Sequence, residues 1–234
     1  MTRSAFTSTP FTPGRRSGTP RILSALAVAL LLSVSAMAAD VGGLSDKLLN
    51  QAAAKYGQAA KARLLDWRNL INSGKNKSEA EKLVLANTFF NRLPYVDDII
   101  HWGKPDYWAT PVEMIASNGG DCEDFSIAKY FTLKEMGVPV ERMRITYVKS
   151  LKLNQAHMVL TYYPTPDADP LVLDNLITEI KPASERTDLV PVYSFNGQDL
   201  WVAKERGRGK RVGTPNQIGL WRDLNARMDK EDSQ

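Results

Sequence analysis

Apolar positions recur every three or four residues between residues 45 and 93, as on one face of a helix. Ser45 and Ser78 each precede such a run and are typical helix caps, and Asn72-Ser73-Gly74 separates two of the runs. The spacing therefore predicts three helices in this region. We interpret their stripe of Trp, Leu and Phe side chains as core packing and not as a binding site.

The next segment is predicted to be a loop followed by two helices. Residues 94 to 109 are rich in proline and aromatic residues. Thr110-Pro111 is a typical cap and first helical residue, and Asn118-Gly119-Gly120 ends the short helix that they begin. A longer helical pattern then runs from Phe125 to Met136 and is closed by Gly137.

After residue 139 the apolar period changes to two, which predicts strands. A turn-prone segment, 164 to 170, separates the second strand from the third, so we expect these two strands to pair as antiparallel neighbours. A weak helical pattern follows Thr214-Pro215 near the end of the chain. Helices followed by a small antiparallel sheet predict an α+β fold. The predicted strands are 144–148, 156–163, 171–176, 191–195 and 200–204.

The first 38 residues are typical of an export signal. Arginines precede an apolar run from Ile22 to Val34, and Ala36-Met37-Ala38 fits a signal-peptidase site. The run is shorter than the roughly 20 residues that a membrane span needs, which favours cleavage after Ala38 over an uncleaved anchor. We therefore predict a signal peptide at 1–38, a single two-lobed domain at 39–234 and a periplasmic location.

The predicted signal also accounts for the formal net charge of +4. Its four arginines are the only charged residues before Asp40, and without them 26 of the 30 basic residues remain against 26 acidic ones. The mature chain is then nearly neutral, which excludes the broad electrostatic footprint of a nucleic-acid-binding protein. The single cysteine excludes an internal disulfide in an oxidising compartment.

That cysteine, Cys122, lies in the run Gly119-Gly120-Asp121-Cys122-Glu123-Asp124-Phe125, at the start of a predicted helix. A helix start offers free backbone N–H groups and the positive end of the helix dipole, both of which favour a thiolate. A free cysteine is more often a small buried residue, but three neighbouring carboxylates do not fit an apolar slot. We therefore interpret Cys122 as a reactive thiol that needs a base.

Two histidines are candidates for that base, His101 in the aromatic loop and His157 in a predicted strand. The following strand carries Asp174 in an apolar setting, where a carboxylate is costly unless it is paired. On an antiparallel neighbour, Asp174 could accept a hydrogen bond from the His157 imidazole and fix its tautomer. The pattern therefore favours His157 as the base and Asp174 as the group that orients it.

The reaction that this set predicts is acyl transfer to water. Cys122 attacks a peptide carbonyl, His157 takes and returns the proton, and the acyl-enzyme is hydrolysed. The backbone N–H of Cys122 is a candidate oxyanion donor. A second donor must come from the preceding segment, where Trp108 is a candidate.

Four short segments carry a resemblance to a known family: Trp108–Glu113, Gly120–Phe125, Ala156–Val159 and Leu173–Asn175. Together they resemble the bacterial transglutaminase-like cysteine proteinases, and within these the LapG-type periplasmic proteases, over about residues 45 to 204. The resemblance implies a papain/transglutaminase-like fold, with a helical lobe that carries the nucleophile packed on a small antiparallel sheet. It also implies a Cys-His-Asp triad, which maps to Cys122, His157 and Asp174.

The same resemblance implies a substrate and a regulator. Members of the family cleave the N-terminal region of large surface adhesins next to a pair of small residues, usually Ala-Ala. Cleavage releases the adhesin and disperses the biofilm. An inner-membrane receptor that binds cyclic di-GMP on its cytoplasmic side sequesters the protease, so we expect no direct binding of cyclic di-GMP and no nucleic-acid partner.

The family is also calcium-dependent, and the residues around the thiol are consistent with this property. Asp121, Glu123 and Asp124 place up to three negative charges beside Cys122, which would raise the pKa of the thiol. A hard cation held by oxygen ligands reverses that effect. Acids are common at helix starts without a metal, but these acids bracket the nucleophile. We therefore predict Ca²⁺ as the cofactor and Asp121, Glu123 and Asp124 as its ligands.

Two alternative functions stay open at this point. A transglutaminase would use the same three side chains but transfer the acyl group to an amine. A non-catalytic, calcium-dependent periplasmic regulator with a vestigial thiol is a different class of protein. The presence of all three members of the Cys-His-Asp set argues against the second alternative.

Overall fold

The computed structural model describes residues 44–203 and 209–233, which belong to one compact unit, Ala38–Gln234. The predicted signal peptide and its cleavage site lie outside the described residues. None of the helices in the described part of the chain is long and apolar enough to cross a membrane.

The described helices follow the predicted order. Ser45, Ser78 and Thr110 cap three of them, as the sequence predicts, and their hydroxyl oxygens accept backbone N–H groups of the first helical turn. Three short 3₁₀ helices, η1 (Val140–Arg142), η2 (Ala183–Glu185) and η3 (Pro215–Gln217), occur in connecting segments. The α-helices are α1 (Asp46–Tyr56), α2 (Gln58–Gly74), α3 (Glu79–Phe90), α4 (Asp98–His101), α5 (Pro111–Ser117), α6 (Cys122–Glu135) and α7 (Gly219–Asp232).

The strands form one antiparallel sheet of seven strands in the order β4-β3-β2-β1-β5-β6-β7. The predicted antiparallel pairing of β2 with β3 is confirmed, with Leu160 opposite Leu173. The two edge strands β4 and β7 were not predicted, because their sequences carry no apolar alternation. The strands are β1 (Met143–Ser150), β2 (Gln155–Tyr162), β3 (Leu171–Leu173), β4 (Lys181–Pro182), β5 (Leu189–Phe195), β6 (Leu200–Val202) and β7 (Lys210–Gly213).

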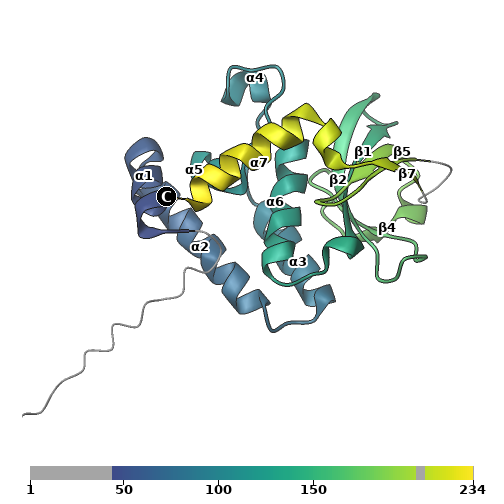
Figure 1. Cartoon of the computed structure of the whole chain (residues 1–234), viewed down its shortest axis with the longest axis horizontal. Helices are drawn as coiled ribbons and strands as arrows, with labels where there is room; N and C mark the ends of the chain where they lie inside the picture. The colour runs from purple at the N-terminus through teal and green to yellow at the C-terminus, as the bar shows by residue number, and fades with distance from the viewer. Residues whose placement is uncertain (1–43, 204–208, 234) are drawn as a thin grey trace, which may run out of the picture. The chain divides into compact units, whose positions relative to one another are not determined.

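Helix α6 lies between the other helices and the sheet (Figure 1). Its side chains are buried without interruption from Asp124 to Leu133. Phe125 and Ala128 pack with α1, α2 and α5 in one apolar cluster, whereas Ile127 and Leu133 pack with the sheet in a second cluster. A helix that is buried on all sides shows no polar face. The first residue of α6, Cys122, packs against the second cluster, on the side of the sheet.

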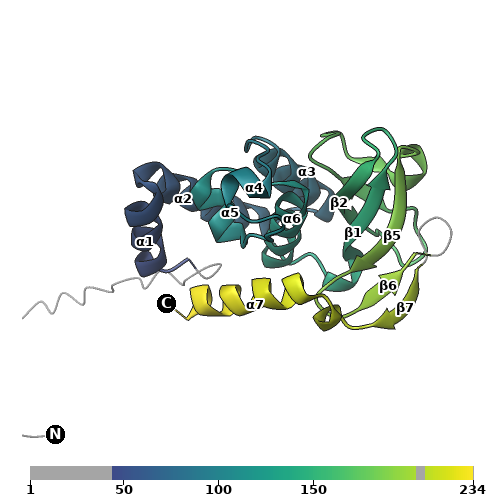
Figure 2. The same ribbon diagram turned by 90° about the horizontal axis from the view of Figure 1, so that it is seen from above.

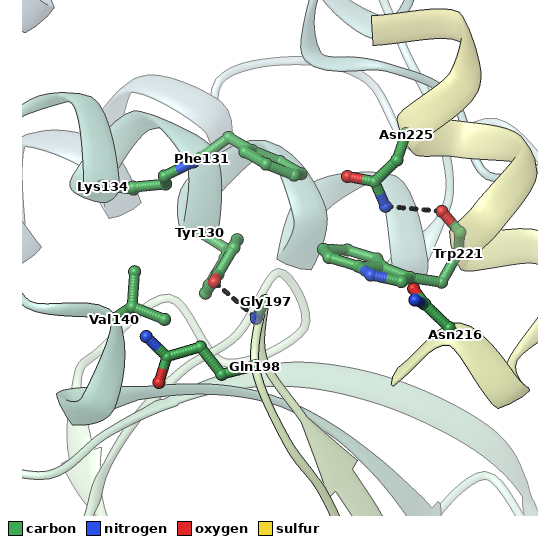
Figure 3. A pocket seen from close by; sticks show the side chains of 9 residues that line it. All are labelled: Tyr130, Phe131, Lys134, Val140, Gly197, Gln198, Asn216, Trp221 and Asn225. Atoms are coloured by element: carbon green, nitrogen blue, oxygen red, sulfur yellow. Dashed lines mark hydrogen bonds between the residues drawn. The ribbon is translucent and has the colours of Figure 1, made fainter. Parts of the chain in front are cut away.

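The C-terminal helix α7 crosses α6 at an angle (Figure 1) and runs from the sheet towards the N-terminal helices (Figure 2). Trp221 anchors it: its ring stacks on Phe131 of α6 at 5.6 Å and meets Phe195 of β5 edge-on at 5.1 Å. A cavity of about 320 Å³ opens beside this contact, between α6, α7 and the β5–β6 turn (Figure 3). Tyr130 also ties α6 to that turn, because its hydroxyl accepts the Gly197 N–H at 2.8 Å.

Three local predictions differ from the structure. Helix α2 continues through Gly74, where a Cβ would lie 2.7 Å from the Met136 sulfur and would displace that side chain. The loop 94–109 contains the short helix α4, and it brings the buried carboxylate of Asp98 to the site described below. Strand β3 ends at Leu173, so Asp174 lies just beyond the pairing and not within a strand.

Candidate active site and metal centre

Cys122 is the first residue of α6, as predicted, and the preceding chain is held in place by backbone hydrogen bonds. Gly120 accepts the Val96 N–H at 2.9 Å. A Cβ at Gly120 would overlap the Asp124 carboxylate, so a glycine is required here. The carboxylate of Asp124 in turn accepts the N–H of Asp121 at 3.3 Å and that of Ala109 at 2.7 Å. This network fixes the entry of the chain into α6.

The thiol of Cys122 is partly exposed and donates to Glu123 Oε2 at 2.7 Å. Burial raises the pKa of this thiol well above its usual value, and the negative charge of Glu123 raises it further. A hydrogen bond from the Met158 backbone acts in the opposite direction and lowers the pKa. Burial and the neighbouring acids therefore oppose the thiolate that the helix start favours.

His157 and Asp174 lie together, as the sequence predicts. His157 Nε2 is 2.8 Å from Asp174 Oδ1, and both side chains are almost fully buried. The Asp174 carboxylate also accepts the Leu176 N–H at 3.0 Å. Burial alone would raise the pKa of Asp174. The hydrogen bond from His157, together with the weaker effect of the Leu176 N–H, outweighs burial and lowers this pKa to about 2. An ionised carboxylate only accepts, so Nε2 carries the proton and Nδ1 of His157 is left as the basic nitrogen.

The thiol lies next to β2, the strand that carries His157. The backbone N–H of Met158, the residue after His157, donates a hydrogen bond to Cys122. Within the described part of the chain, no hydrogen bond joins Cys122 to His157. The other histidine, His101, has a different environment: its Nε2 is 2.8 Å from the Ser117 hydroxyl, and its ring packs edge-on against Trp102. His101 therefore links α4 to α5 as a structural residue.

An acidic cluster surrounds the start of α6 and is larger than the sequence indicated. Asp121 and Glu123, predicted as ligands, are joined by Asp98 from α4 and by Asp106 from the following loop. Two overlapping groups, Asp98-Asp121-Asp124 and Asp98-Asp106-Glu123, each place their carboxylate oxygens within 4.8 Å of one another. Asp98 and Asp106 were missed because 94–109 has no periodicity that places its acids near Cys122.

The chemistry of this cluster fits a hard cation. Oδ1 of Asp98 and Oδ1 of Asp121 are buried and have no hydrogen-bond partner. Burial raises the pKa of Asp98 to about 6, and burial together with Glu123 raises that of Asp121 well above its usual value. Buried carboxylates crowded in this way resist ionisation unless a positive charge joins them. Asp124 differs, since both of its oxygens already accept backbone N–H groups.

Trp108, the candidate for a second oxyanion donor, is buried beside the same cluster. Its side chain donates a hydrogen bond to Asp106 and so lowers the pKa of that carboxyl, which burial raises. Its ring stacks on Phe195 at 5.8 Å. Trp108 therefore joins the acidic cluster to the core, and its side-chain donor already has a partner.

Comparisons with known proteins show the family of this chain. Two solved structures of LapG from Legionella pneumophila are 48% identical to the chain: the EGTA-treated form (TM-score 0.69, 78% of this chain and 96% of that chain) and the calcium-bound form (TM-score 0.67, 79% and 99%). Comparison with curated protein sequences gave no match. Residues 64–207 match the family described as bacterial transglutaminase-like cysteine proteinase, BTLCP. The chain therefore belongs to the bacterial transglutaminase-like cysteine proteinases.

Proposed function

We propose that this chain is a calcium-dependent periplasmic cysteine endopeptidase that cleaves the N-terminal region of a large surface adhesin near a pair of small residues. Cleavage would release the adhesin and disperse the biofilm. The observation that carries the proposal is the buried His157–Asp174 pair beside a cysteine that starts a helix and is surrounded by carboxylates. The periplasmic location rests on the export signal predicted at residues 1–38.

In the proposed mechanism Cys122 is the nucleophile and His157 the general base. Asp174 holds the imidazole with Nδ1 free, so His157 can take the thiol proton and return it to the leaving amine. The backbone N–H of Cys122 lies in the first turn of α6, where it has no intrahelical partner, and it serves as an oxyanion donor. Water then hydrolyses the thioester and restores the thiol.

The acidic cluster would hold Ca²⁺ through Asp98, Asp121 and Glu123, with Asp106 as a further oxygen donor. Asp124 supports the site by fixing the backbone of Asp121. When bound, the cation supplies positive charge that offsets the carboxylates and lowers the pKa of the neighbouring thiol. Calcium-bound and EGTA-treated forms of the Legionella protein support this assignment.

The proposed partners follow from the same family resemblance. They are the adhesin as substrate and an inner-membrane receptor for cyclic di-GMP as inhibitor, with no binding of the nucleotide by this chain. A transglutaminase uses the same set of side chains, so the nature of the acyl acceptor must be measured.

Incubation with an N-terminal adhesin fragment, calcium and a fluorescent primary amine separates hydrolysis from amide transfer. We expect two fragments, and mass spectrometry should find a free carboxylate at the new C-terminus. In water enriched in ¹⁸O that carboxylate should gain one ¹⁸O atom. Fragments or intact chains that carry the amine would show a transglutaminase instead.

A further inference from the structure

Arg186 contacts the Asp174 carboxylate at the oxygen that His157 does not use. It follows η2 and is 3% exposed. Its Nη2 donates to Asp174 Oδ2 at 2.7 Å, while His157 occupies the other oxygen, Oδ1. A buried arginine therefore shares one carboxylate with the proposed catalytic base.

The guanidinium is itself held in place by a second carboxylate. Nε and Nη2 of Arg186 donate to the two oxygens of Asp188, each at 2.9 Å. This two-point contact fixes the plane of the guanidinium, since the fork of an arginine matches a carboxylate. Asp188 is anchored through its carbonyl, which accepts the Leu151 N–H at 2.8 Å at the end of β1.

The backbone of Asp174 is held separately by α3 and α6. Its carbonyl accepts Nδ2 of Asn91 at 2.8 Å and the ammonium of Lys129 at 3.1 Å. Burial lowers the pKa of Lys129 to about 7, against the effect of Asp174, which raises it. Above neutral pH, Arg186 is therefore the lasting positive charge beside Asp174.

We propose that Arg186 is a positioning residue of the catalytic site, which keeps the Asp174 carboxylate ionised and oriented towards His157. The proposal rests on the proposed function, because it gives His157 and Asp174 their catalytic roles. Arg186 is buried and acts through Asp174, so it should affect the chemical step and leave substrate binding unchanged.

The test compares R186Q, R186K and R142Q. Arg142 is the control, since its Nη1 donates to both oxygens of Glu79 of α3, at 3.0 and 2.9 Å, and it touches none of the proposed catalytic residues. R186Q should lower kcat about 10- to 100-fold, as loss of an orienting partner does elsewhere, with KM unchanged. R142Q should keep wild-type kinetics.

The pH profile distinguishes positioning from a general loss of stability. The charged groups that face Asp174 are His157, Arg186 with its partner Asp188, and Lys129. Loss of the Arg186 charge should move the acid limb of kcat/KM upwards by about one pH unit. R186K keeps the positive charge but lacks the paired N–H donors of the guanidinium. It should therefore retain more of the wild-type kcat than R186Q does, with little shift of the acid limb of kcat/KM.

A measurement without substrate separates this inference from the proposed function. The chain has two histidines, so the low-field imidazole N–H resonance of His157 can be assigned with His101→Ala. In the Cys122→Ala background this resonance should be lost by exchange in R186Q and retained in R186K and R142Q. If the wild type cleaves no peptide and R186Q still loses the resonance, the proposed function fails and the positioning role stands.

Two results would overturn the positioning role. One is a folded R186Q with wild-type kcat, an unmoved acid limb and an intact His157 resonance. The other applies if R186Q does not fold and R186K does. R186K keeps the positive charge, so loss of the His157 resonance in R186K, with the rate loss and pH shift predicted for R186Q, would show that this charge does not hold the Asp174 carboxylate in place.

Discussion

Chelation of calcium is expected to lower the rate of peptide cleavage about 1,000-fold or more at neutral pH. Burial and Glu123 raise the pKa of the Cys122 thiol well above its usual value. Each pKa unit above the working pH lowers the thiolate fraction tenfold, and buried groups shift by up to about 3 to 5 units. The measurement is cleavage of an adhesin fragment in calcium, in EGTA and after calcium is restored.

The residues of the metal site can be tested by a matched pair of neighbours. Asp98 carries a buried, unpartnered oxygen in the acidic cluster, whereas Asp97 belongs to none of its groups. Asp98→Asn should weaken calcium binding about 10- to 100-fold by calorimetry, because affinity follows the number of charged ligands. Asp97→Asn should leave it unchanged. Equal calcium affinities in the two variants would contradict the assignment of Asp98.

The same cluster predicts how pH affects stability without calcium. The folded-state pKa of Asp98 is raised to about 6 from its usual 3.8. The folded state then holds a proton that the unfolded chain releases, so this contribution to stability is present at low pH and is lost as the pH rises through about 6. Calcium bound in the proposed site would offset the negative charge of Asp98 in place of that proton. The increase in Tm on adding calcium should therefore be larger at pH 8 than at pH 5.

Substitution of His157 by alanine or of Asp174 by asparagine is expected to lower kcat about 10,000-fold. The alanine variant lacks the base. The asparagine variant can present an N–H to Nε2 in place of a carboxylate oxygen, which favours the wrong tautomer of His157. Thermal unfolding must accompany the assay, because Asp174→Asn also removes one of the two carboxylates that pair with the buried Arg186.

His101→Ala is the control for these variants. His101 bonds to Ser117 and packs on Trp102, so its loss should change the rate by about twofold at most, as expected for a residue outside the chemistry. If His101→Ala lost activity and His157→Ala retained it, His101 would be the base and the proposed mechanism would be wrong.

Local patterns were sufficient to predict the helix caps, the strands β1, β2, β3, β5 and β6, and the pairing of β2 with β3. The cap hydroxyls of Ser45, Ser78 and Thr110 act within one helical turn, so neighbouring residues determine them. The approach of His157 and Asp174 also followed from strand order alone. Long-range packing decided the rest: helix α2 includes Gly74, which packs against Met136 from a distant part of the chain.

The candidate site also divides into residues that local sequence patterns reveal and residues that only long-range packing brings together. Cys122, Asp121 and Glu123 are neighbours in the chain and could be recognised together. Asp98 and Arg186 could not, since each reaches the site from a segment without apolar period. The neighbouring acids already predicted a raised pKa for the thiol, but burial, which raises this pKa most, could not be predicted from the sequence.

The central claim is that Cys122 hydrolyses an adhesin peptide bond and that calcium makes it competent. The most direct measurement incubates an N-terminal adhesin fragment with the wild type and with Cys122→Ala, each in calcium and in EGTA, and resolves the products by mass. The account predicts two fragments for the wild type in calcium and an intact substrate in the other three samples. Cleavage by Cys122→Ala, or by the wild type at full rate in EGTA, would contradict it.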